Sequence, residues 1–123
     1  MSSKDDVLIV EDSPAIGMLL KSYLEKLGYT QIHTCVTGSA AITTFNDLVS
    51  QNKQPIVLLD YMLPDMDARS VLTQMLEVQP NTRVILDPTR NCFLNHQCVF
   101  YNISWNKTLY FFQKMFFHIH HIP

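Results

Sequence analysis

The sequence predicts an α/β fold built on a doubly wound parallel sheet. Three short apolar runs, at residues 7–10, 56–59 and 84–86, show no alternation between polar and apolar side chains. Runs of this kind are typical of strands that are buried on both faces. Segments with apolar residues at helical spacing separate the runs. A repeated strand–helix order predicts a parallel sheet with helices on its faces.

The first helix has clear start and stop signals. Ser13 can serve as its N-cap, and Pro14 suits the first helical position. Apolar side chains then recur at helical spacing as far as Leu27, and Gly28 can end the helix. A weaker strand candidate follows at residues 31–36. The N-terminal part of the chain therefore predicts a strand, a helix and a second strand.

Two further helices are expected between the later runs. Residues 39–49 place Ile42, Phe45 and Val49 on one helical face. Asp67 can cap a third helix, which must stop before Pro80. With these helices, the repeated pattern extends from the first apolar run to about residue 86.

Length and composition predict one globular domain. The chain has 123 residues, of which 47% are hydrophobic and 16% charged, and its net charge is −2. It has neither an apolar run long enough to span a membrane nor the apolar stretch of a signal peptide. The three cysteines are odd in number and lack a zinc-binding spacing, so we interpret them as free thiols. We expect a cytoplasmic protein that does not contact a membrane.

The composition changes abruptly near residue 88. All 11 acidic residues lie at or before Asp87, whereas residues 90–123 contain 9 of the 13 aromatic residues and 4 of the 5 histidines. One hypothesis is a C-terminus from a shifted reading frame or unspliced sequence. The aromatic side chains could instead be core residues, or could cover an exposed sheet edge in a homodimer. Three cations make too thin a patch to predict nucleic-acid binding, and we interpret the histidines as a His-rich end rather than a metal site.

The first two apolar runs are directly followed by acidic residues. Glu11 and Asp12 follow the first run, and Asp60 follows the second. In doubly wound sheets the functional crevice lies at the carboxyl ends of the strands. If the two strands are neighbours, the three carboxylates converge and require a cation, and oxygen ligands favour Mg²⁺. In the simpler alternative, Asp12 only caps a helix and Asp60 only begins a turn.

Two sequence blocks carry a family resemblance. "VLIVEDSP" (7–14) and "VLLDYMLPDMDA" (57–68) resemble the receiver domain of two-component response regulators. An acid pair ends the first strand of that family, and a Pro lies four positions after its phosphoacceptor Asp, as Pro64 does here. The resemblance covers about residues 6–86. It implies a flavodoxin-like receiver fold in one domain, 1–123, with a family-like part, 1–87, and a divergent tail, 88–123.

The resemblance also implies roles for the acidic residues. Asp60 would be the phosphoacceptor and would take its phosphoryl group from a histidine kinase or a phosphotransfer protein. Mg²⁺ would be held by Glu11, Asp12, Asp60 and the backbone carbonyl of Met62. Phosphorylation would switch a surface that binds a downstream protein, whose identity the sequence does not give. We therefore expect a signalling module rather than an enzyme.

Two groups that the family requires are difficult to find. Pro88 stands where a switch hydroxyl is expected, and Thr89 comes one position later. The usual Lys-Pro motif is absent, so that Lys107, Lys114 or neither replaces the lysine that pairs with the phosphoryl group. We therefore expect the last helix–strand–helix unit to be atypical or incomplete.

The sequence leaves two alternative functions open. One is a degenerate pseudo-receiver that acts only as an interaction module. The other is a Mg²⁺-dependent phosphohydrolase, which ranks lower because Met62 stands where that class needs a second acid.

Overall fold

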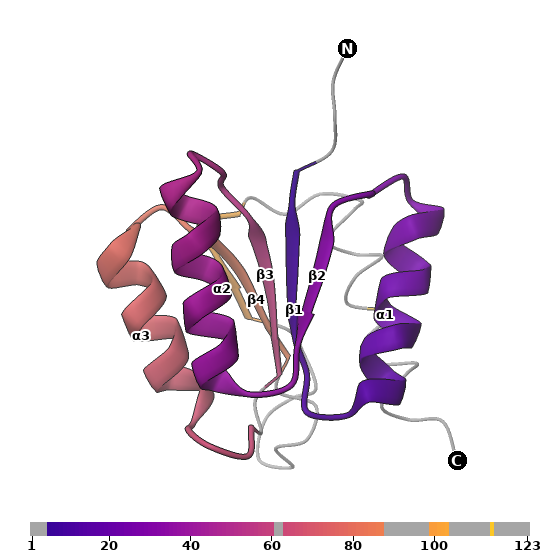
Figure 1. Cartoon of the computed structure of the whole chain (residues 1–123), viewed down its shortest axis with the longest axis horizontal. Coiled ribbons are helices and arrows are strands. Elements are labelled where there is room, and N and C mark those ends of the chain that lie inside the picture. Colours follow the sequence, from indigo (N-terminus) through magenta and orange to yellow (C-terminus); the bar gives the residue numbers. More distant parts are fainter. Residues whose placement is uncertain (1–4, 61–62, 88–98, 104–113, 115–123) are drawn as a thin grey trace.

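The protein is described from a computed structural model, which defines residues 5–60, 63–87, 99–103 and 114. Five strands form one sheet in the order β2-β1-β3-β4-β5, and helices lie on both of its faces (Figure 1). The strands are β1 (Val7–Val10), β2 (Ile32–Cys35), β3 (Ile56–Asp60), β4 (Arg83–Asp87) and β5 (Val99–Tyr101). The helices are α1 (Pro14–Lys26), α2 (Gly38–Ser50) and α3 (Ala68–Val78).

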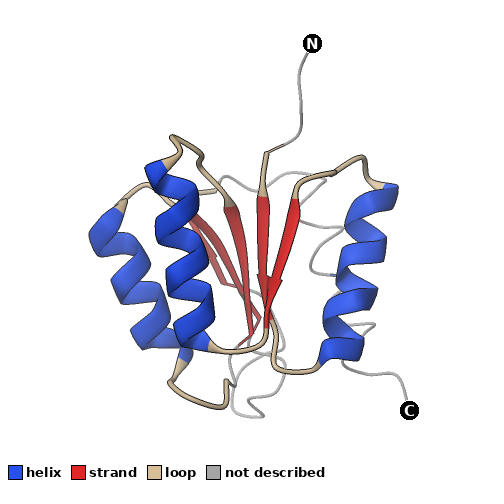
Figure 2. Cartoon of the chain, in the orientation of Figure 1, coloured by secondary structure: helices blue, strands red, loops and turns tan. Residues whose placement is uncertain are grey.

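The first four strands confirm the predicted parallel arrangement. β1 lies between β2 and β3, and β4 pairs with the other edge of β3, all in parallel. Helix α1 covers one face of this sheet, and α2 and α3 cover the other (Figure 2). This order returns the chain to the opposite side of β1 after α2, which makes β1 and β3 direct neighbours.

A side-chain oxygen caps the start of each of α1, α2 and α3. The Ser13 hydroxyl accepts a hydrogen bond from the Ile16 amide at 3.3 Å, as the predicted N-cap requires. Asp67 caps α3 through the Ser70 amide at 2.8 Å, which confirms that prediction. Helix α2 begins at Gly38, slightly before the predicted range, because the Thr37 hydroxyl caps it.

Alternate residues of the strands point to two separate apolar cores. Val7, Ile9 and Leu58 pack beneath α1 with Leu20 and Leu24. The second core lies beneath α2 and α3, and its fully buried members include Leu8, Val10, Phe45, Val57, Leu59, Val71 and Met75. Because both faces of β1 and β3 are covered, these strands contain only apolar residues until the acidic residues at their ends.

β5 lies in the C-terminal part of the chain, which was expected to be atypical or incomplete. This strand was not predicted, and it pairs antiparallel with β4, with Val99 opposite Leu86 and Tyr101 opposite Val84. The Asn102 side chain donates hydrogen bonds to the carbonyls of Pro80 and Thr82, at 2.9 and 2.8 Å. This segment therefore covers the edge of β4.

Several predictions concern residues outside the described ranges. They concern the roles of the histidines and of most aromatic residues of the tail, and the homodimer that those aromatic residues could form. Within the described ranges, no helix has both the length and the apolar character needed to cross a bilayer.

Asn102→Ala is expected to lower the free energy of unfolding by about 1–2 kcal/mol, because two hydrogen bonds to backbone carbonyls are lost. Urea denaturation measures this change. Asn52→Ala is the matched control: Asn52 shares the left-handed backbone, with φ 62° against 60° at Asn102. An equal loss in both variants would mean that backbone strain alone, and not the anchoring of β5, is responsible.

Candidate metal centre

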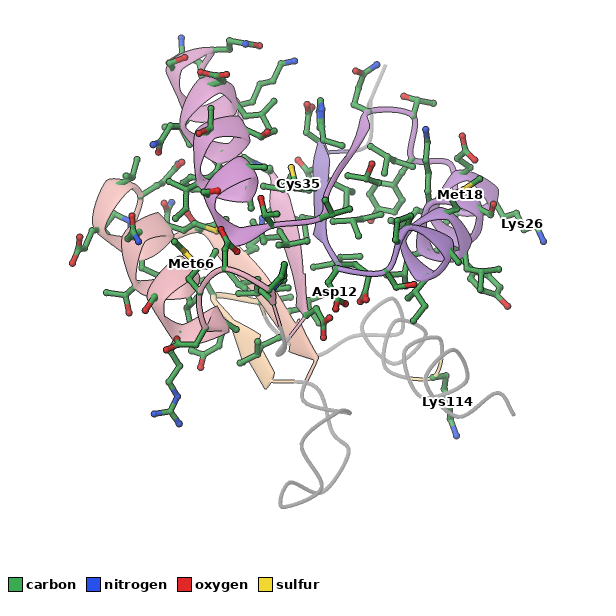
Figure 3. All side chains as sticks on the ribbon, turned by 60° about the horizontal axis from the view of Figure 1, so that its bottom comes forward. Asp12, Met18, Lys26, Cys35, Met66 and Lys114 are labelled. Carbon is green, nitrogen blue, oxygen red and sulfur yellow. The ribbon has the colours of Figure 1, made fainter. Side chains whose placement is uncertain are left out.

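Strand register brings the acidic residues to one edge of the sheet. Val10 lies opposite Leu59 in the β1–β3 ladder. Asp60, the last residue of β3, and Glu11, the first residue after β1, therefore lie side by side. The Glu11 amide donates to the Cys35 carbonyl at 2.9 Å, which fixes the backbone of Glu11 at the end of β2 as well. Figure 3 shows Asp12 at this carboxyl-terminal edge of the strands.

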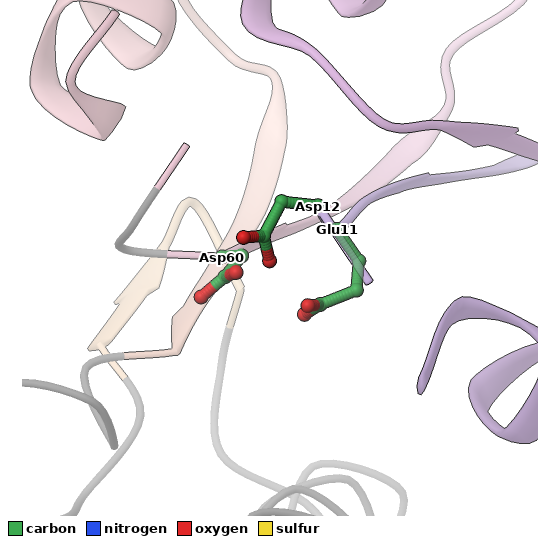
Figure 4. A group of neighbouring side chains, drawn as sticks. All are labelled: Glu11, Asp12 and Asp60. Carbon is green, nitrogen blue, oxygen red and sulfur yellow. The ribbon is translucent and has the colours of Figure 1, made fainter. Parts of the chain in front are cut away.

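The three carboxylates converge into one cluster (Figure 4). One oxygen from each of Glu11, Asp12 and Asp60 lies within 4.8 Å of the oxygens of the other two. Glu11 and Asp60 are only 3% and 2% exposed, whereas Asp12 is half-buried. Asp12 is thus the member of the cluster that is most accessible to water or an incoming ligand.

The start of α1 helps to hold Glu11. Its carboxylate accepts a hydrogen bond from the Ser13 amide at 3.2 Å. Ser13 is also the N-cap of α1, so the carboxylate lies near the positive end of the helix dipole. Glu11 therefore has a fixed orientation toward the cluster.

The donor set fits a hard divalent cation. Two unit charges about 4 Å apart repel by about 1 kcal/mol in water and about 4 kcal/mol at the effective dielectric of a protein surface. Burial of two of the three groups increases the cost of keeping all of them ionised. A cation with oxygen ligands, such as Mg²⁺ or Mn²⁺, offsets both effects. The simpler interpretation, in which Asp12 caps α1, fails because Ser13 is the cap.

Asp65 holds the loop after β3 against another helix, a role that the sequence analysis missed. Its carboxylate accepts hydrogen bonds from the amides of Gly38 at 2.7 Å and Ser39 at 3.0 Å. The Ser39 and then the Gly38 amide bonds lower the pKa of Asp65 below its ordinary value of 3.8. Helix-capping patterns join residues within one helix start. Asp65 lies more than 25 positions from Gly38 and Ser39, so no local pattern predicts the contact.

Of the remaining predicted site residues, only Lys114 lies within the described part of the chain. Met62, Thr89 and Lys107 lie outside the described residues. Lys114 is exposed, and its side chain points away from Asp12 in Figure 3. Lys114 is helical and therefore does not end a strand.

Comparisons with known proteins agree on one family. The sequence profile of the family "Response regulator receiver domain" matches residues 7–91. The transcriptional regulatory protein SrrA of Staphylococcus aureus is 35% identical over 82 residues, which are 67% of this chain and 32% of SrrA. The chain thus spans about a third of the length of the curated relatives it matches.

Two solved structures of similar proteins agree with this family. A chain in the crystal structure of the CheX–CheY–BeF3–Mg²⁺ complex from Borrelia burgdorferi has a TM-score of 0.62 and 31% identity, covering 68% of this chain and 61% of its own. The Mn²⁺-bound form of response regulator Rcp1 has a TM-score of 0.51 and 26% identity, covering 68% of this chain and 64% of its own. Both structures contain a divalent cation, Mg²⁺ in the first and Mn²⁺ in the second.

Asp12→Asn is expected to raise the free energy of unfolding by about 1 kcal/mol or more in metal-free buffer, because it removes one of three repelling charges. Urea denaturation in the presence of EDTA measures the effect. Asp47→Asn, in the exposed part of α2, controls for the change in net charge. A loss of stability specific to Asp12→Asn would contradict the account of a repulsive cluster.

The hydrogen bonds of Asp65 are expected to make stability depend on pH only in strongly acidic solution. Because its pKa is lower in the folded protein, its contribution is complete above the unfolded value and is lost as pH falls through the folded one. The NMR signals of the Gly38 and Ser39 amides should therefore titrate with midpoints below 3.8. Midpoints at or above that value would show that the bonds do not form in solution.

Proposed function

This chain belongs to the family of response regulator receiver domains, and we propose that it accepts a phosphoryl group on Asp60 in a Mg²⁺-dependent reaction. One observation carries the proposal. Asp60 is buried at the end of β3, within 4.8 Å of two further carboxylates, at the edge where doubly wound sheets place their functional groups.

Four groups would hold the metal ion. They are the carboxylates of Glu11, Asp12 and Asp60 and, by family resemblance, the backbone carbonyl of Met62. The bound ion would supply positive charge to offset the charge on the phosphoryl oxygens. Asp12, which is more exposed, suits the role of a direct ligand. Glu11, which is buried, suits a supporting role behind it.

The proposed step transfers a phosphoryl group from a donor atom to a carboxylate oxygen. An Asp60 carboxylate oxygen forms a bond to phosphorus, while the bond between phosphorus and the donor atom breaks. The donor leaves with the electron pair of that bond, and Asp60 becomes an acyl phosphate. This product adds charge and acceptor oxygens at the end of the sheet, where Thr89 is the candidate hydroxyl that would respond to them.

The proposed donors are a histidine kinase or a phosphotransfer protein, which receiver domains generally use. We place the reaction in the cytoplasm, where these donors have their phosphoryl-transfer groups. The downstream partner is a protein of unknown identity that would bind the switched surface. SrrA is a transcriptional regulatory protein, but the match to a third of its length gives no reason to propose DNA binding for this domain alone.

A pseudo-receiver is the second candidate function. The antiparallel direction of β5 favours it, because a strand that runs in this direction does not deliver its final residue to the cluster as the family arrangement would. In this case the domain would bind partners without accepting phosphate. The two candidates differ in one measurable property, the formation of phospho-Asp60.

Incubation with acetyl phosphate and Mg²⁺ should add one phosphoryl group to the wild-type protein, detected by mass spectrometry of the intact chain. Asp60→Ala should abolish the addition, because the attacking oxygen is absent. Asp12→Ala should slow it by about tenfold or more through weaker metal binding. EDTA should have the same effect on the wild type.

Asp67→Asn serves as the control, since it alters a nearby carboxylate that only caps α3. Phosphate retained at wild-type levels by Asp60→Ala would disprove the assignment of the acceptor. Mg²⁺ binding without any phosphorylation of the wild type would favour the pseudo-receiver.

A further inference from the structure

Two aspartates in the loop after β3 accept hydrogen bonds from the first turns of different helices. Asp67 bonds to the Ser70 amide and caps α3, the helix that the loop itself enters. Asp65 instead bonds to the Gly38 and Ser39 amides at the start of α2. The two residues have the same side chain and are both exposed. Only Asp65, however, joins the loop to an element distant in sequence.

A packing contact strengthens the same junction. Gly38 is buried, and a Cβ atom at this position would lie 2.4 Å from Cγ and 2.8 Å from Sδ of Met66. Met66 packs against the core beneath α2 and α3. The absence of a side chain at Gly38 thus lets Met66 approach the helix at the point where Asp65 also binds. Two adjacent loop residues are held by one turn of α2.

We infer that Asp65 is a positioning residue for the acidic site, because it fixes the loop that directly follows Asp60 to the first turn of α2. This inference rests on the proposed function. The ladder fixes one end of the segment at Asp60, and the two amide bonds fix the other end at Asp65. Four residues separate these points, and the ring of Pro64 restricts one of them further.

This short tether explains why an exposed carboxylate affects the metal site. A chain segment held at both ends has few accessible conformations, so that less entropy is lost when it is ordered around a bound ion. Release of the Asp65 end restores that freedom and weakens ion binding. Residues that orient a metal site from outside commonly change its affinity by about 10–100-fold.

The test compares two isosteric variants, Asp65→Asn and Asp67→Asn. Each removes one charge from the same loop. The amide side chain introduced by Asp65→Asn offers only one acceptor oxygen to the two backbone amides and places an NH₂ group against the other. Asn is as good an N-cap as Asp, so Asp67→Asn keeps the cap of α3. Mg²⁺ affinity by calorimetry, the rate of phosphorylation by acetyl phosphate and urea denaturation are measured for both.

A second pair perturbs the junction from the helix side. Gly38→Ala should displace Met66 and loosen the loop. Gly17→Ala is its control within α1, because a Cβ there would meet no atom within 4 Å. We expect Asp65→Asn and Gly38→Ala to weaken Mg²⁺ binding about tenfold, with the two control variants within twofold of the wild type. Hydrogen exchange of the metal-free protein should be faster at residues 63–67 in Asp65→Asn than in Asp67→Asn.

The outcomes separate this inference from the proposed function. Wild-type binding and phosphorylation, with equal Mg²⁺ affinities for Asp65→Asn and Asp67→Asn, would overturn the role of Asp65 and leave the function intact. Unchanged exchange at residues 63–67 in Asp65→Asn would also overturn it, whatever the metal affinity. Failure of the wild type to bind Mg²⁺ would remove both proposals together.

Discussion

The parallel pairing of β1 with β3 is the contact on which the acidic site depends. Its register places Val10 opposite Leu59, so that Glu11 and Asp60 leave the apolar core at the same level. A shift of one residue would turn the side chains of either strand to the other face. Such a shift would disrupt the close packing of specific side chains in both cores at once. The site is therefore positioned by the packing of residues that carry no charge.

Sequence patterns were sufficient to predict the first four strands, the three helices and the acidic cluster. They succeeded because these signals lie in neighbouring positions of the sequence. Ser13 and Asp67 cap the helices that directly follow them, and acidic residues directly follow the first two apolar runs. β5 was not predicted, since its pairing with β4 and the bonds of Asn102 to Pro80 and Thr82 are long-range contacts with no periodic signal. The Asp65 contact was missed for the same reason. Its donor amides lie at the start of a helix that already has its own cap in Thr37.

The cluster and the Asp65 junction place opposite demands on the fold. Glu11, Asp12 and Asp60 repel one another and reduce stability without a cation, whereas Asp65 satisfies two amides at the start of α2. Both involve the short segment after β3: Asp60 of the cluster lies at its start, and Asp65 lies at its end. Functional sites commonly retain such unfavourable interactions, which the surrounding structure maintains. Here the surrounding structure is formed by α2 and α3. The contact between Gly38 and Met66 joins α2 to the loop after β3.

The antiparallel direction of β5 determines where the chain emerges from the sheet. A parallel fifth strand delivers its final residue to the same edge as Asp60, whereas β5 begins near that edge and ends opposite the first part of β4. Asn102, which follows it, bonds beside the turn that precedes β4. A residue that directly follows β5 is thus separated from Asp60 by the length of the strand. If Asp60 accepts a phosphoryl group as proposed, a basic side chain that pairs with that group must come from another segment of the chain or from a partner protein.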